Sequence, residues 1–189
     1  MTRTGIISVA AVLVAGGALG AAGVLTGRAP IPRSAAAPSG PVWTETAWPF
    51  PMDPWGKGKA FRCRAEHCGA EVNLYLRAKL GLCGCVSAID DDDVDRVADV
   101  DLIGGERVAL GPGRPIEVRW MKGRGRGYAV GGRGETAKSA LAIAFHDRCD
   151  MAVATAAIGG DRPAAQEDAV IAFLNSDRVL RWAEATLGL

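Results

Sequence analysis

Apolar and polar residues alternate along the middle of the chain in a way that predicts strands. Val72, Leu74 and Leu76 alternate with polar residues, which favours a strand with one buried face, although helical spacing fits this stretch almost as well. Two further apolar stretches, 107–110 and 116–121, flank the turn residues Gly111-Pro112-Gly113-Arg114 and predict a hairpin. A return strand is expected over residues 128–130.

The last third of the chain predicts a second hairpin and then helices. The apolar runs 140–145 and 151–158 surround the polar tip His146-Asp147-Arg148. A helix is expected from about Ala164, and Asn175-Ser176 caps a second segment beginning at Asp177. Strands followed by helices indicate an α+β fold, an antiparallel sheet with a C-terminal helix packed on it.

Residues 5–27 carry no charged side chain and are flanked by Arg3 and Arg28. As a helix, these residues would span roughly 34 Å, enough to cross the ~30 Å hydrocarbon layer of a membrane. The segment predicts either an uncleaved transmembrane anchor or a cleaved signal peptide. In both cases we expect the main domain outside the cytoplasm. It would be periplasmic and tethered to the inner membrane as a single-pass protein, or secreted to the periplasm after cleavage.

Composition divides the chain into three parts. Residues 1–28 form the signal anchor or signal peptide, residues 29–58 a proline-rich linker, and residues 59–189 a periplasmic α+β domain. The linker contains aromatic residues at its C-terminal end, which we expect to dock on the domain. About 130 residues are enough for one domain and too few for two.

Charge is segregated along the chain although its total is only +1. Residues 90–106 carry eight acidic groups and one arginine, and residues 107–138 carry eight basic groups and two acidic ones. We expect the two stretches to lie near each other and screen each other. The run Asp90–Asp93 reads as a helix start rather than a calcium loop, because the spacing of calcium ligands is absent.

The basic stretch contains Lys122, Arg124 and Arg126, separated by glycines. The segment reads as a basic hairpin loop, and the alternative is a loop that contacts anionic lipid head groups or an acidic partner. Nucleic acid is not expected, because the segment is short and lies between apolar strands. No phosphate-binding loop motif is present.

Five cysteines are the strongest local signal: Cys63, Cys68, Cys83, Cys85 and Cys149. In an oxidising compartment, clustered thiols form disulfides that stabilise a small domain. Cys83 and Cys85 are too close to bond each other easily, which allows two tethers back to Cys63 and Cys68, with Cys149 as the free thiol. The alternative is a metal or thiol-redox site made by the first four cysteines, or a zinc domain facing the cytosol.

Several stretches together resemble a known family. They are Trp48-Pro-Phe-Pro, Phe61-Arg-Cys, Cys83-Gly-Cys, Trp120-Met-Lys-Gly-Arg, Phe145-His-Asp-Arg-Cys-Asp and Phe173-Leu-Asn-Ser-Asp. The chain is similar to uncharacterised exported or single-pass membrane proteins of alphaproteobacteria. That resemblance implies a periplasmic setting and brings no activity or catalytic residue. The order of the late elements is also loosely similar to Mog1/PsbP-like domains.

The sequence therefore predicts a membrane-tethered periplasmic accessory or binding domain, stabilised by disulfides, whose ligand it does not name. No catalytic residue and no cofactor are expected, and a non-enzymatic role is favoured. The expected partners are the inner membrane, through residues 5–27, and a membrane protein.

Overall fold

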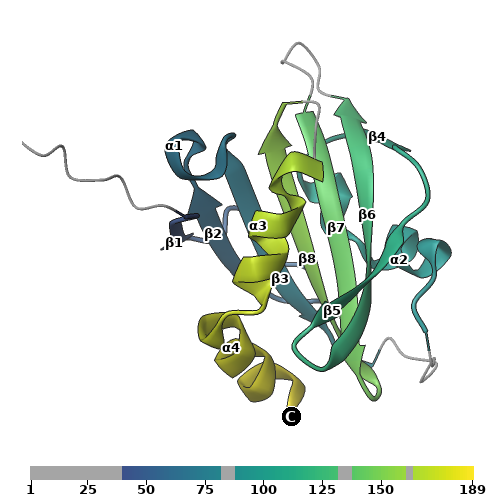
Figure 1. Cartoon of the computed structure of the whole chain (residues 1–189). Helices are drawn as coiled ribbons and strands as arrows, with labels where there is room; N and C mark the ends of the chain where they lie inside the picture. Colours follow the sequence, from purple (N-terminus) through teal and green to yellow (C-terminus); the bar gives the residue numbers. More distant parts are fainter. Residues whose placement is uncertain (1–39, 82–87, 132–137, 161–163) are drawn as a thin grey trace, which may run out of the picture. The chain divides into compact units, whose positions relative to one another are not determined.

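The structure is a computed structural model, and it describes residues 40–81, 88–131, 138–160 and 164–189 (Figure 1). Strands and helices follow in the order β1 (Trp43–Thr46), β2 (Lys59–Cys63), α1 (Ala65–Cys68), β3 (Val72–Lys79), α2 (Asp91–Val97), the 3-10 helix η1 (Asp99–Leu102), β4 (Glu106–Ala109), β5 (Arg114–Val118), β6 (Met121–Gly131), β7 (Lys138–Asp147), β8 (Asp150–Gly159), α3 (Ala164–Leu174) and α4 (Asp177–Leu187). The predicted α+β class, with C-terminal helices packed on an antiparallel sheet, is confirmed.

The strands form one antiparallel sheet in the order β1-β2-β3-β8-β7-β6-β4, with β5 also paired to β6. The predicted hairpin around residues 146–148 is confirmed, because Asp147 pairs with Asp150 across a two-residue turn. The predicted hairpin at residues 111–114 is wrong. Strands β4 and β5 run in the same direction along one edge of β6, and the true turn lies at Arg119 and Trp120 between β5 and β6. Arg119 has a φ of 58°, as the first position of a tight hairpin turn requires.

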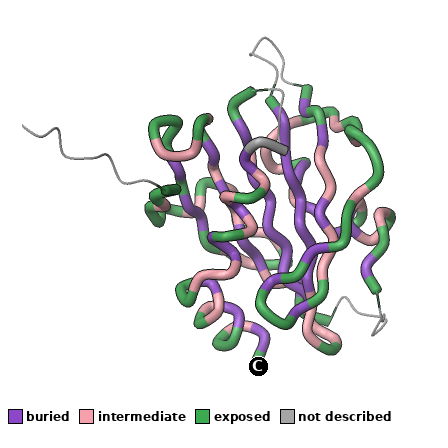
Figure 2. Tube along the Cα trace, viewed as in Figure 1, coloured by how far each residue is buried: buried purple, intermediate pink, exposed green. Residues whose placement is uncertain are grey.

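Both faces of the sheet are covered, whereas the sequence predicted helix on one face. Figure 2 shows the central strands buried along most of their length. We call the face under α3 and α4 the helix face; its apolar cluster includes Leu74, Ile143, Phe145 and Leu174. We call the opposite face the ion-pair face. It is covered by α2, η1 and the segment 48–56, and its smaller cluster contains alanines of β7 with Val94 and Val100.

Strand β6 has a strict division between its two faces. Arg124, Arg126 and Tyr128 project to the ion-pair face, where they contact carboxylates of α2. The alternating Gly123 and Gly125 face the helix side. A Cβ at Gly123 would lie 2.6 Å from the Ala144 carbonyl oxygen and 2.8 Å from the Phe145 Cβ. The glycine spacing of this segment therefore reflects close packing within a strand.

The C-terminal helices begin where the sequence predicts. The Ser176 hydroxyl accepts a hydrogen bond from the Val179 amide at the start of α4, and the chain leaves the helix through Gly188 in a left-handed conformation. On α4, Val179, Ala183 and Leu187 recur every four residues and are buried on the sheet. Helix α2 starts within the acidic run, as predicted, and the structure adds a capping box between Asp90 and Asp93.

The segment assigned to the linker is partly folded. Strand β1 belongs to the sheet, and Trp48 and Phe50 pack against Tyr75, so the folded domain begins well before residue 59. The expected docking of these rings is confirmed. Within the described ranges no helix is long and apolar enough to cross a membrane. The proposed anchor, residues 5–27, lies outside the described residues.

Candidate functional site

A cleft of about 500 Å³ opens on the ion-pair face between two covering segments. Its floor is formed by β3, through Asn73 and Tyr75, and by the end of β8, through Ala157. One wall is the segment around Phe50, and the other is the end of η1 around Leu102. The cleft size and its mostly apolar lining are typical of a site for a small organic ligand.

Aromatic rings form the wall on the N-terminal side. The rings of Phe50 and Tyr75 meet edge to face with centroids 4.7 Å apart, and Trp48 packs against both. Such pairs are favourable beyond their buried area, because the positive edge of one ring meets the negative face of the other. Burial raises the pKa of the Tyr75 hydroxyl, which therefore stays protonated at neutral pH. The cleft thus has a rigid aromatic wall and an uncharged floor.

Polar side chains also line the cleft. Glu71 and Lys138 belong to the lining together with Asn73 of the floor. The hydrogen bond from Arg62 holds the pKa of the Glu71 carboxyl below its usual range, so this group is ionised. A polar end of a ligand in the cleft would find its hydrogen-bond partners in these three side chains.

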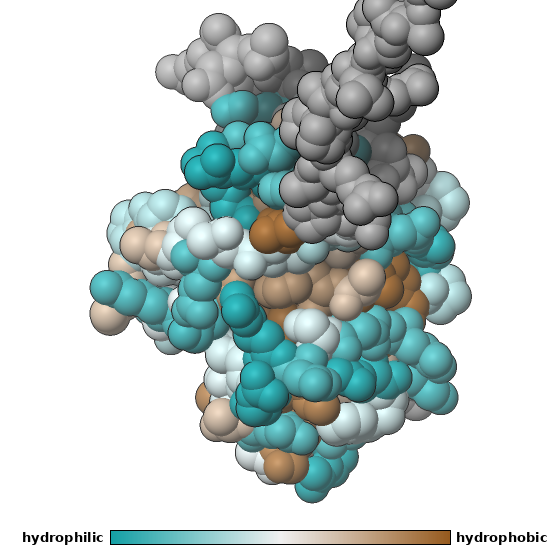
Figure 3. Space-filling view, turned by 60° about the vertical axis from the view of Figure 1, so that its left-hand side comes forward, coloured by the Kyte–Doolittle hydropathy of each residue, from teal (hydrophilic) through white to brown (hydrophobic). Residues whose placement is uncertain are grey.

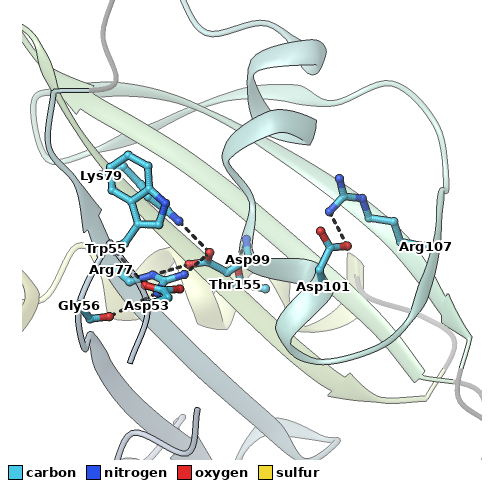
Figure 4. A network of polar contacts seen from close by, with 9 residues as sticks. All are labelled: Asp53, Trp55, Gly56, Arg77, Lys79, Asp99, Asp101, Arg107 and Thr155. Atoms are coloured by element: carbon cyan, nitrogen blue, oxygen red, sulfur yellow. Dashed lines mark hydrogen bonds and ion pairs between the residues drawn. The ribbon is translucent and has the colours of Figure 1, made fainter. Parts of the chain in front are cut away.

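Both walls are fixed by a single guanidinium on β3, shown in Figure 4. Arg77 donates to Asp99, the first residue of η1, through Nε at 2.9 Å, and to Asp53 through Nη1 at 2.6 Å. Lys79 also donates to Asp99 at 2.9 Å, and the Asp99 amide donates to the Thr155 hydroxyl. Arg77 therefore links the strand under the cleft to the segments that carry its two walls.

This network is buried and electrically balanced. Only 3% of the Arg77 side chain and 5% of the Lys79 side chain are exposed, against 10% of Asp99. The hydrogen bond from Arg77 lowers the pKa of Asp53 below its ordinary value, and the cluster pairs two basic side chains with two acidic ones. Removing one member would leave a charge without its partner in a poorly solvated place, which is strongly destabilising. The cleft walls are therefore held in a defined position.

The predicted anionic-partner loop is part of strand β6 and not a loop. Arg124 pairs with Asp91 at 2.5 Å, and Arg126 pairs with Asp95 at 2.7 Å. Both guanidinium groups are therefore neutralised within the chain, as the expected mutual screening of the two charged stretches requires. Lys122 is exposed and has no ion pair with any described residue.

The same contacts explain the acidic run. Asp91 accepts hydrogen bonds from Arg124 and from the Gly113 amide, which lower the pKa of this carboxyl. Asp95 accepts from Arg126 and from the Tyr128 hydroxyl. Within the part of the chain that the structure describes, no group of three or more acidic, histidine or cysteine side chains could hold a metal ion.

The cysteines pair differently from the expected pattern. Cys63 and Cys68 are bonded to each other, closing the short connection that contains α1, so the two tethers from Cys83 and Cys85 to these residues are wrong. The four-thiolate metal alternative is wrong for the same reason, because a disulfide supplies no thiolates. Cys149 is disulfide-bonded and is not a free thiol. Cys83 and Cys85 lie outside the described residues.

Sequence reasoning missed the residues that build the cleft. The alternation in β3 predicts a single buried face with Leu74 and Leu76, and gives no sign that Tyr75 and Arg77 on the other face are covered. The signal was present in Asp53 and Asp99, acidic residues that flank the aromatic and apolar wall segments. On the side that Figure 3 shows, apolar side chains emerge in a central band among hydrophilic ones.

Known proteins show little similarity to this chain. No protein-family model and no curated protein matches the chain. Among solved structures, the chain is similar to the cyanobacterial PsbP protein (CyanoP) of Synechocystis sp. PCC 6803, with 13% identity and a TM-score of 0.41 over 73% of this chain and 80% of that one. Function must therefore be argued from the residues themselves.

Proposed function

We propose that the chain is an exported, membrane-tethered accessory domain that binds a small ligand in the cleft between Phe50 and Leu102. The observation that carries the proposal is the buried network around Arg77, which holds both walls of the cleft in place. Desolvating two cations and two anions is costly and adds little net stability compared with apolar packing. A network of this kind preorganises a site, because it keeps the walls in place before the ligand binds and so lowers the cost of binding.

The disulfides support the exported location. Stable disulfides form in oxidising compartments and are rare in the cytoplasm. Cys63 is fully buried, which is typical of a structural bond and not of a redox-active pair. The uncharged run 5–27 supplies the means of export and, if it is not cleaved, the tether.

The lining of the cleft defines the ligand class. The aromatic wall and the aliphatic side chains of Leu102 and Ile103 favour a planar or branched apolar group. The polar lining residues Glu71, Asn73 and Lys138 suit a polar end that exchanges hydrogen bonds. We therefore propose a small amphipathic organic molecule with an aromatic or branched aliphatic body.

The binding site is tested with the fluorescent aromatic probe 1-anilinonaphthalene-8-sulfonate. Ala157 lies on the cleft floor, so Ala157→Phe should fill the space and raise the dissociation constant of the probe at least tenfold. The matched control is Ala129→Phe, the same change at an exposed site on β6 away from the cleft. If Ala157→Phe binds the probe as tightly as wild type, the cleft is not the site.

The compartment is tested separately. An alkaline phosphatase fusion after Gly40 should be active, because that enzyme needs disulfides that form outside the cytoplasm. Thiol counting on the unreduced full chain should find at most one free cysteine out of five, since Cys63, Cys68, Cys149 and one bonding partner are consumed. An inactive fusion together with four or more free thiols would contradict export.

A further inference from the structure

Almost every arginine that the structure describes has a carboxylate partner. The pairs are Arg62–Glu71, Arg64–Glu66, Arg77–Asp99, Arg96–Asp93, Arg107–Asp101, Arg114–Glu167, Arg119–Asp177, Arg124–Asp91, Arg126–Asp95 and Arg148–Asp147. Arg178 and Arg181 are the exceptions: both are exposed, and neither makes an ion pair with a described residue. They lie three residues apart on α4 and therefore share one side of that helix.

An exposed tryptophan lies at the tip of the hairpin that contacts the start of α4. Trp120, at the tip of the β5–β6 hairpin, is 54% exposed. The preceding residue fixes the tip against the start of α4, because the Arg119 amide donates to the Asn175 side chain at 2.6 Å and its guanidinium pairs with Asp177 at 2.5 Å. We call Trp120, Arg178 and Arg181 the tip patch.

The chain enters the domain beside the same junction. Trp43, at the start of β1, stacks on Phe173 with ring centroids 4.7 Å apart. Phe173 is two residues before Asn175, which holds the β5–β6 tip. The described part of the chain therefore begins close to the α3–α4 turn that also holds the β5–β6 tip.

We propose that the tip patch docks on anionic lipid head groups of the membrane in which the chain is anchored. Tryptophan is favoured at the level of the head groups, because its ring is apolar and its N–H finds a hydrogen-bond acceptor there. Arginines without internal partners are attracted by the negative surface of the bilayer. The inference rests on the proposed membrane tether, which keeps the domain close to the lipid.

Docking also limits how the domain can turn. With residues 5–27 in the membrane and the tip patch on its surface, the domain has two attachments, and the second is favoured by the high effective concentration that the first creates. The cleft opens on the ion-pair face, whereas α4 covers the helix face. Ligand access to the cleft would therefore stay open while the domain is docked.

The test uses the full chain incorporated into nanodiscs. Brominated lipids quench tryptophan emission at the membrane surface, and we compare brominated phosphatidylglycerol with brominated phosphatidylcholine. We expect quenching with the anionic lipid, lost in Trp120→Phe and in the double variant Arg178→Glu/Arg181→Glu. The matched control, Lys57→Glu/Arg96→Glu, has the same charge change at two exposed positions remote from the patch and should be quenched like wild type.

The outcomes separate docking from tethering. If the full chain incorporates but quenching is equal in the two lipids, or persists in the double arginine variant, the docking proposal is overturned and the tether stands. If the chain does not float with lipid at all, the tether fails and this inference fails with it. High salt should abolish the quenching without releasing the chain from the membrane.

Discussion

The two faces of the sheet are covered by different means. The helix face is covered by α3 and α4 through a continuous apolar cluster of 21 buried residues, among them Leu74, Phe145 and Leu174. The ion-pair face has a smaller cluster rich in alanine, and its covering segments are held by charged contacts: Arg77 to Asp53 and Asp99, Arg124 to Asp91, and Arg126 to Asp95.

The two faces therefore have different roles: one stabilises the fold, and the other positions the segments that cover it. Apolar burial is non-directional and roughly proportional to area, so the helix face supplies most of the stability. Ion pairs and their hydrogen bonds have defined geometry, and add little once desolvation is counted. The ion-pair face therefore determines where η1 and the segment 48–56 lie, and with them the walls of the cleft.

The largest effect is expected in the helix-face core. Phe145 is completely buried, so Phe145→Ala should lower the free energy of unfolding by about 3–5 kcal/mol, through lost burial and the cavity left behind. Urea unfolding followed by far-UV circular dichroism measures it, and the loss should not depend on salt. Val108→Ala, at an exposed edge position, is the control and should cost less than about 0.5 kcal/mol.

The next effect separates the two faces. Arg77→Leu should cost about 3 kcal/mol, because Asp99 keeps Lys79 as its partner but loses the guanidinium. Arg77→Leu should also weaken probe binding in the cleft, because both walls lose their anchor. Phe145→Ala, compared under conditions where the same fraction of each protein is folded, should not. A variant that destabilises the fold but binds the probe normally would show that the network does not shape the cleft.

Loss of the disulfide should have an intermediate effect. Cys63→Ala/Cys68→Ala removes a bond that closes a loop of five residues, and should cost about 2 kcal/mol through the greater freedom of the unfolded chain. Because Cys63 belongs to the helix-face cluster, probe binding should be unchanged once the variant is folded. Melting temperature with and without a reductant checks the first statement, and probe titration checks the second.

Acid should affect the ion-pair face selectively. The folded-state pKa of Asp53 lies below its ordinary value of 3.8, because Arg77 donates to it. Its contribution is therefore present above pH 3.8 and is lost as the pH falls through the lowered pKa. Asp53→Asn should abolish this part of the acid sensitivity, which is seen by comparing urea midpoints of the two proteins from pH 6 to pH 3. Parallel curves would contradict it.

The smallest effect is expected at an exposed pair. Lys59 and Glu45 lie 2.6 Å apart across β1 and β2, but each side chain is almost half exposed. Solvent and salt screen such a pair, so Lys59→Ala should change stability by about 0.5 kcal/mol or less. A loss as large as that of Arg77→Leu would mean that burial does not explain the difference between the two networks.

The sequence predicts the elements of this fold better than their arrangement. The helix start in the acidic run, the cap at Ser176 and the hairpin tip at residues 146–148 depend on local chemistry and were predicted. The continuation of β4 into β5 was not, because Gly-Pro-Gly is as suitable for a bulge on one edge as for a reversal of the chain. Side-chain alternation in β3 gave its two faces, but not that the second face would be covered.

The candidate site was not predicted, for a physical reason. Arg77, Asp53 and Asp99 are separated by more than twenty residues along the chain, and only the pairing of β3 with β8 and the packing of η1 bring them together. The cysteine pairing failed similarly, since spacing alone leaves many connections open. Export, the anchor and the membrane partner stay predictions of the sequence.

The alternation of arginine and glycine in β6 also makes this strand intolerant of a register shift against β7. Shifting β6 by one residue against β7 would turn Arg124 and Arg126 to the helix face, toward Ile143 and Phe145, and would place glycines opposite the carboxylates of α2. Two unsolvated guanidinium groups in an apolar interior are so unfavourable that the misaligned sheet could not form. The arginines that neutralise α2 therefore also select the register of the central strands, because neighbouring registers would bury their charges.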